Sequence, residues 1–145
     1  MLSQRNNRSR GGAVLEMILV LPLLLWVAFG TVEYGYFFYV KHTIQGAARE
    51  GCRAGITPTS TNTDVQTAVA GSLYAAGLIA SNSYSAVTTK GYTVTISPSN
   101  VATVTAGSSV TVTVSNTWGT VGVRPWGLIG TGKSVAGASV MRKEG

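Results

Sequence analysis

The chain opens with a long apolar stretch that follows a short polar leader. Residues 1–10 are polar and basic and show no periodic apolar positions, so we expect them to be disordered and cytoplasmic. Residues 13–32 carry a single charge, at Glu16. As a helix this stretch is about 30 Å long, the thickness of the hydrocarbon core of a bilayer. The pattern predicts a transmembrane helix over about residues 13–33.

A secretory signal peptide also has basic residues before an apolar run. The stretch here is longer than a typical signal core, and it continues into a further helical pattern without a small-x-small cleavage site. A retained anchor is therefore the better interpretation. The aromatic residues that follow it suit a membrane interface and are Tyr34, Tyr36, Phe37, Phe38 and Tyr39. The arginines that precede it, Arg5, Arg8 and Arg10, place the N-terminus inside and the rest of the chain outside.

The helical pattern continues beyond the aromatic cluster. Apolar residues recur there at helical spacing, at Val40, Ile44, Ala47, Ala48 and Cys52. We therefore expect one long helix over residues 12–56, half in lipid and half in water. Pro22 removes one backbone hydrogen bond in the membrane half, which predicts a kink rather than a break.

The remaining residues, 57–145, are expected to form an exported domain. A Thr-rich connector leads to a second helix within residues 64–80, and Thr61, Asn62 or Thr63 is the candidate N-cap. After a polar break, Val and Thr alternate with a period of two in residues 92–97, 109–115 and 135–142. These segments predict three or four antiparallel strands with one face covered by a helix. The expected fold class is α+β.

Composition agrees with a membrane or extracellular protein. Charged residues make up 11% of the chain, against about 25% in ordinary soluble domains. The net charge is +6 and the isoelectric point near 9.8, but the basic residues are scattered and form no stripe interleaved with aromatics. We therefore expect no nucleic-acid partner.

Residues suited to catalysis or metal binding are scarce. Cys52 is the only cysteine, so an internal disulfide is excluded, and we expect it to be a small buried apolar residue. The only histidine, His42, lies ten residues earlier in the same predicted helix, which separates the two side chains by about 15 Å. With no nucleophile–base pair or metal set in the sequence, we expect no enzyme, no metal site and no cofactor.

Residues 127–134, GLIGTGKS, match the spacing of a nucleotide-binding P-loop. A P-loop needs a buried strand before it and a helix after it, so that backbone amides converge on phosphates. Here Pro125 precedes the motif, and of the eleven residues after Ser134 only Glu144 is acidic. We interpret the segment as a Gly-rich turn that leads into the last strand, with no nucleotide bound.

Several ordered motifs over residues 10–55 resemble the N-terminal region of TadE-like proteins. The matching elements are Arg10-Gly11, Glu16, Leu21-Pro22-Leu23-Leu24, Phe29-Gly30-Thr31-Val32-Glu33 and Ala47-Ala48-Arg49-Glu50-Gly51. The C-terminal Met141-Arg142-Lys143-Glu144 is similar to the closing strand of that family. The middle of the chain is not covered by the resemblance.

The resemblance implies a pilin-like fold and a role as a pseudopilin or minor pilin in assembly of the tight-adherence (Flp) pilus, a type IV-like system linked to secretion. It places the chain in the bacterial inner membrane as a single-pass protein. The implied partners are the lipid bilayer, other pilin-like subunits, the pilus assembly machinery and a prepilin peptidase.

The resemblance also implies the site residues. Cleavage between Gly11 and Gly12 would leave Glu16 as the fifth residue of the mature chain, where it could neutralise the terminal amine of a neighbouring subunit inside an apolar bundle. Glu16, Pro22 and Glu33 are the residues expected in helix packing within the membrane. Met17 stands where the family often has an aromatic residue, which leaves an uncut bitopic anchor open.

A second hypothesis needs no filament. The chain would then be a membrane-anchored adhesin or periplasmic scaffold whose helix serves only as an anchor. The role of Glu16 separates the two hypotheses. A carboxylate within a membrane helix costs about 2.5–3.5 kcal/mol on insertion scales and usually has a partner or a function. The alternative is that Glu16 sits near the inner interface and its side chain reaches toward water.

Overall fold

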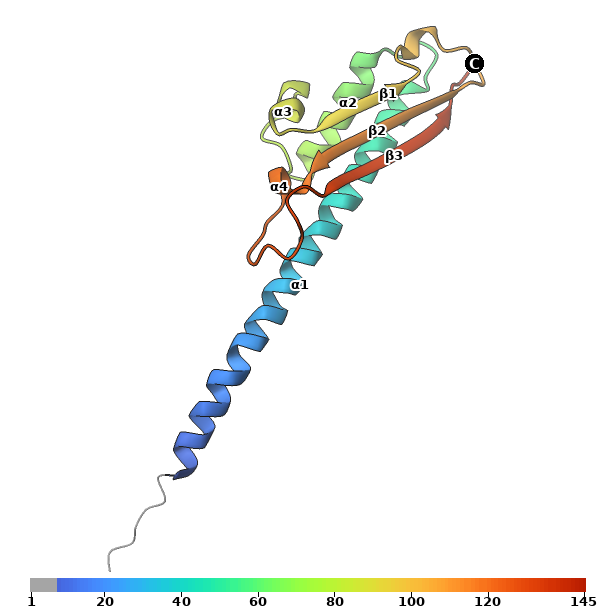
Figure 1. Cartoon of the computed structure of the whole chain (residues 1–145). Coiled ribbons are helices and arrows are strands. Elements are labelled where there is room, and N and C mark those ends of the chain that lie inside the picture. The colour runs from blue at the N-terminus through green and yellow to red at the C-terminus, as the bar shows by residue number, and fades with distance from the viewer. Residues whose placement is uncertain (1–7) are drawn as a thin grey trace, which may run out of the picture.

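The computed structural model describes residues 8–145, and it shows one long helix that carries a small α+β domain along its C-terminal half (Figure 1). The helices are α1 (Arg8–Gly55), α2 (Asn62–Ala75), α3 (Tyr84–Thr89), the 3-10 helix η1 (Val101–Thr103) and α4 (Trp118–Val121). The strands are β1 (Thr93–Ser97), β2 (Ser109–Thr117) and β3 (Ser134–Arg142). Of the basic leader predicted at residues 1–11, residues 1–7 lie outside the described residues.

Helix α1 is 48 residues long and continues through Pro22 without a break. It begins at Arg8, before the expected start at residue 12, so the interpretation of residues 8–10 as disordered was wrong. These residues contain no proline, and a helix already formed by the apolar stretch extends into them at low cost. The kink expected at Pro22 stays a prediction.

The strands form one antiparallel sheet in the order β1-β2-β3, which confirms the predicted α+β class with a three-stranded sheet. Thr93 pairs with Ser115, and Ser109 pairs with Arg142. Valine and threonine alternate along β2 because successive side chains point to opposite faces. The valines of β2, at 110, 112 and 114, are fully buried, and α1 lies on that face (Figure 1).

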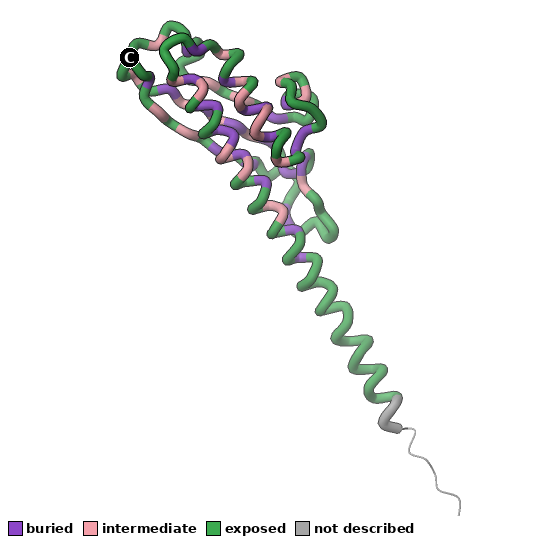
Figure 2. The backbone as a smooth tube through the Cα atoms, turned by 180° about the vertical axis from the view of Figure 1, so that it is seen from behind, coloured by how far each residue is buried: buried purple, intermediate pink, exposed green. Residues whose placement is uncertain are grey.

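The core forms where α1 meets α2 and the sheet. The five apolar α1 residues expected there are all fully buried: Val40, Ile44, Ala47, Ala48 and Cys52. Cys52 is the small buried residue that was predicted, and its thiol lies 3.2 Å from the carbonyl oxygens of both Val110 and Ser139. Figure 2 shows the resulting change along α1, from exposed at its N-terminal half to partly buried at its C-terminal half.

Helix α2 is shorter than predicted. Its N-cap is Thr61, one of the three candidates, in a capping box with Asp64. Its C-terminus lies at Ala75 rather than near residue 80, because Gly77 adopts a left-handed conformation with φ of 70°. The N–H of Leu78 then donates to the carbonyl of Leu73 at 3.0 Å, a Schellman ending.

Helix α3 was missed, because residues 81–85 are polar and were interpreted as a break. Ser83 caps this short helix through its side chain. Only Val87 of α3 is buried, so the segment lacks the apolar periodicity by which a helix is recognised.

Candidate functional site at the apolar half of the long helix

Most of the N-terminal half of α1 is uncovered by the rest of the described chain. Every large apolar side chain from Val14 to Phe29 is between 40% and 74% exposed. The helix is apolar and long enough to cross a membrane. Burial of one such side chain is worth about 1.5–3 kcal/mol, so a surface of this size needs a lipid or protein environment to cover it.

The predicted site residues are spread along this half rather than gathered in one place. Gly11 and Gly12 lie exposed in the first turns of α1, and Glu16 is exposed one turn later. Seventeen residues separate Glu16 from Glu33, which corresponds to about 25 Å along a helix. Of Glu16, Pro22 and Glu33, only Glu33 meets a distant part of the chain.

Glu33 marks the junction between the apolar half and the domain. Its side chain is fully buried, and the N–H of Ile129 donates a 2.8 Å hydrogen bond to its Oε1. The backbone of Trp126, Gly127 and Leu128 lies close to the carboxylate, but its second oxygen, Oε2, is buried without a hydrogen-bond partner among the described residues. The positive φ of Gly127, 65°, lets the loop turn beside the carboxylate.

Two apolar contacts hold the same loop on α1. The rings of Trp126 and Phe29 lie 6.1 Å apart. Leu128 lies over Gly30, where an added Cβ would approach its Cδ1 to 3.2 Å. The loop therefore contacts the segment Phe29-Gly30-Thr31-Val32-Glu33 at three points: the ring of Phe29, the backbone at Gly30 and the carboxylate of Glu33.

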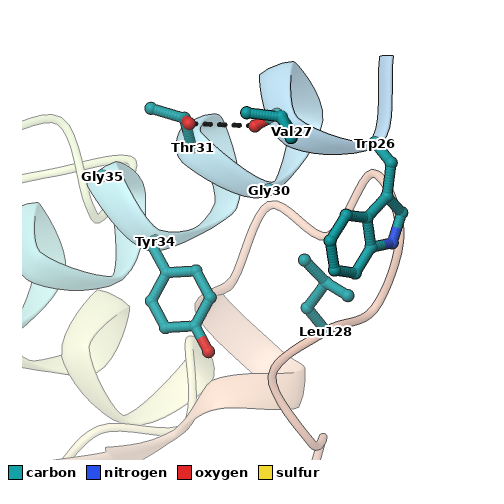
Figure 3. A pocket seen from close by; sticks show the side chains of 7 residues that line it. All are labelled: Trp26, Val27, Gly30, Thr31, Tyr34, Gly35 and Leu128. Carbon is teal, nitrogen blue, oxygen red and sulfur yellow. Dashed lines mark hydrogen bonds between the residues drawn. The ribbon is translucent and has the colours of Figure 1, made fainter. Parts of the chain in front are cut away.

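Beside this contact lies an open groove of about 510 Å³ (Figure 3). Its lining is apolar or small and consists of Trp26, Val27, Gly30, Thr31, Tyr34, Gly35 and Leu128. The hydroxyl of Thr31 donates to the carbonyl of Val27 at 2.9 Å, so it stays within the helix. The groove offers no convergent polar groups for a polar ligand.

The second motif of α1, at residues 47–51, packs in the core of the domain. Ala47, Ala48 and Gly51 are buried, whereas Arg49 and Glu50 point to solvent. A Cβ on Gly51 would lie 2.7 Å from Cγ2 of Val69, so the absence of a side chain lets α2 approach closely. The small residues of this motif are packing residues.

A family model described as TadE-like protein matches residues 11–53, which span both motifs. This match confirms the resemblance inferred from the sequence. Residues 11–53 are TadE-like. Comparison with curated proteins gives no match, and neither does comparison with solved structures. The TadE-like match and the exposed apolar helix together fit a membrane protein associated with the Tad pilus.

The aromatic residues after the TadE-like apolar stretch divide into two groups, which corrects their interpretation as one interfacial belt. Tyr36 and Phe37 are half-buried and pack on Trp118, with ring centroids 6.1 Å and 5.1 Å from it. Tyr34, Phe38 and Tyr39 are 45–52% exposed. Sequence alone could not separate them, because the position of Trp118 depends on the fold.

Lys143 is a buried residue that sequence reasoning missed. It follows β3, and its ammonium donates to Ser60 Oγ at 2.7 Å, to the Val101 carbonyl at 3.1 Å and to the Gly55 carbonyl at 3.3 Å. Gly55 is the last residue of α1, where a cation is favoured by the helix dipole. The closing residues of the chain therefore tie the end of the TadE-like helix to the domain.

The GLIGTGKS segment supplies part of the loop on Glu33. Strand β3 begins at Ser134, where a P-loop would need a helix. The amide of Ile129 is used on Glu33. Within residues 8–145, no group of three or more His, Cys, Asp or Glu side chains could hold a metal ion.

Proposed function

We propose that this protein is a pseudopilin or minor pilin of the tight-adherence pilus, anchored in the inner membrane by α1 until it joins a pilus. In this proposal the N-terminus is cytoplasmic and the domain lies on the outer side. The observation that carries the proposal is the exposed apolar half of α1 with Glu16 within it.

Two environments can cover such a helix. Lipid covers it in the membrane, and apolar faces of other helices cover it in a bundle. A helix that must move from lipid into a helical bundle needs to be apolar on all sides. Residues 14–29 of α1 are exposed and carry a single charge, at Glu16. The domain meanwhile uses only the C-terminal half of α1 for its core.

Glu16 gives the proposal its specificity. A carboxylate in a membrane helix has an insertion cost, which reaches about 2.5–3.5 kcal/mol at the helix centre, so a plain anchor gains nothing from it. In a bundle of pilin-like helices it has a partner if a prepilin peptidase cuts between Gly11 and Gly12, because cleavage creates an amine on each subunit. Both glycines are exposed and accessible.

The test compares Glu16→Ala and Glu16→Gln with Glu50→Ala, which removes an exposed carboxylate from the same helix outside the apolar half. Pili are sheared from cells that carry each variant, and the membrane level of the protein is measured by immunoblot. We expect both Glu16 variants to abolish pilus assembly or their own incorporation at a normal membrane level, whereas Glu50→Ala behaves as wild type.

Replacement of residues 13–32 by an unrelated membrane helix tests the adhesin or scaffold hypothesis. A pilin-like subunit should lose function on this replacement, because its helix must pack against other subunits. Full function with the foreign helix, or with Glu16→Ala, would contradict the proposed role and favour a simple anchored module.

A further inference from the structure

We propose that the segment between α4 and β3, residues 122–133, enters the outer interface of the phospholipid bilayer as a second membrane contact beside α1. We call this segment the membrane-proximal loop. The inference rests on the proposed membrane anchoring of α1 and adds a lipid-binding element from a distant part of the chain.

The contacts of the loop with α1 determine how far it reaches toward the membrane. Trp126 lies on Phe29, and Leu128 lies over Gly30 and beside Trp26 in the groove. Phe29 precedes Glu33 by four residues and Trp26 precedes it by seven, so these contacts lie about 6–10 Å along the helix from Glu33 toward the N-terminus. If residues 13–33 span the bilayer, the loop cannot touch Phe29 and Gly30 without reaching the membrane interface.

The side chains of the loop suit that position. Val123, Trp126 and Leu128 are 49%, 53% and 38% exposed, although each is apolar. Tryptophan favours the interface, where its ring is in the apolar region and its N–H can reach polar groups. Arg124 and Lys133 are exposed, and residues 121–134 contain no acidic residue. Anionic phospholipid headgroups attract such cations.

Glu33 binds one backbone amide of the irregular loop at this depth in the membrane. Unsatisfied N–H groups are costly in a region with little water. The carboxylate accepts from the N–H of Ile129, so this amide of the loop is satisfied without water. Two contacts with the membrane would limit rotation of the domain about the axis of α1.

Depth-dependent quenching tests the inference on the full-length chain. Trp126→Cys, Val123→Cys, Leu19→Cys and Val140→Cys are labelled with the fluorophore NBD in vesicles of phosphatidylethanolamine and phosphatidylglycerol. Leu19 reports the predicted span, and Val140, 62% exposed on β3, reports the domain. The wild-type chain, whose Cys52 is buried, is the labelling blank. Quenching by doxyl-labelled lipids is then measured.

We expect positions 123 and 126 to be quenched several-fold more strongly than position 140, with blue-shifted emission. Val123→Cys keeps Trp126, so it reports the loop even if Trp126→Cys perturbs it. Weak quenching at 123 and 126 with strong quenching at 19 would overturn the inference and leave the anchor intact. Weak quenching at 19 would overturn the proposed anchoring itself. Quenching that rises only when the protein is diluted in lipid would show that another protein copy covers the loop, which also contradicts lipid as its partner.

Discussion

The ammonium of Lys143 donates a 3.3 Å hydrogen bond to the carbonyl of Gly55, the last residue of α1. The two residues are 88 positions apart, and the contact closes the domain onto the helix. Lys143 is 4% exposed, and its three partners are uncharged oxygens. Loss of the ammonium would remove three hydrogen bonds from a buried site, although Gly55 keeps a donor in Ser60 Oγ and Val101 keeps one in the N–H of Val104.

Lys143→Met tests this closure, because it keeps most of the side-chain volume and removes the donors. A hydrogen bond to a charged group contributes about 1.5–3 kcal/mol. We therefore expect the domain to unfold about 10 °C earlier, as measured by thermal melting of the full chain in detergent. Lys90→Met, at an exposed position, is the matched control and should melt with wild type. Equal melting of both variants would show that the buried contacts contribute nothing.

Gly137→Ala tests the close packing of β3 on α1. A Cβ at this position would lie 2.7 Å from both the Cα and the N of Gln45. Backbone atoms cannot move aside as a flexible side chain does, so we expect a loss of about 1–3 kcal/mol in the free energy of unfolding. Gly132→Ala is the control, because nothing lies within 4 Å of its added methyl. Hydrogen exchange along β3 should accelerate in the first variant only.

The capping box of α2 gives a pH-dependent prediction. Hydrogen bonds from the side chain and the backbone N–H of Thr61 lower the pKa of Asp64 below its ordinary value of 3.8. A lowered pKa in the folded state stabilises the fold above the unfolded value, and this contribution is lost as the pH falls through the folded value.

Melting temperatures from pH 7 to pH 2.5 measure this effect. The advantage of wild type over Asp64→Asn should be constant at neutral pH and should shrink below about pH 4. Thr61→Val should reduce this pH-dependent component without abolishing it, because it deletes the side-chain donor but keeps the backbone N–H of residue 61. A constant gap between wild type and Asp64→Asn down to pH 2.5 would show that the Asp64 carboxylate does not act through its charge.

Glu33→Ala tests the attachment of the membrane-proximal loop. Removal of a hydrogen bond to a charged acceptor costs about 1.5–3 kcal/mol. We expect the amide of Ile129 and its neighbours to exchange at least about tenfold faster, as measured by hydrogen exchange in detergent. Glu33→Gln, which keeps an uncharged acceptor, should have a smaller effect, and Glu50→Ala should have none. Unchanged exchange in Glu33→Ala would mean that Phe29 and Gly30 hold the loop alone.

Periodicity in the sequence predicted the parts of the fold that depend on one face being buried. The apolar positions of α1 from Val40 to Cys52 and the Val/Thr alternation of β2 each lie where the pattern placed them. Helix α3 and the end of α2 escaped prediction, because they depend on a Ser83 cap and on the left-handed Gly77 rather than on a repeated apolar face.

The residues of the candidate site were likewise predicted only in part. Glu16, Gly11 and Gly12 were found from local motifs, and their roles stay predictions. The hydrogen bond between Glu33 and Ile129 joins residues 96 positions apart. The hydrogen bonds of Lys143 join residues up to 88 positions apart. No local pattern in the sequence indicates such contacts. The Gly-rich composition of residues 127–132 was a signal for an unusual loop, but it could not name the carboxylate on which that loop lies.

Protease treatment of spheroplasts from cells that express the full chain tests the central claim most directly, with the protein followed by an antibody to the domain. If α1 spans the inner membrane with the domain outside, the chain remains with membranes after a carbonate wash, and external protease digests the domain in intact spheroplasts. Recovery of the chain in the soluble fraction, or protection of the domain until the spheroplasts are lysed, would contradict the account.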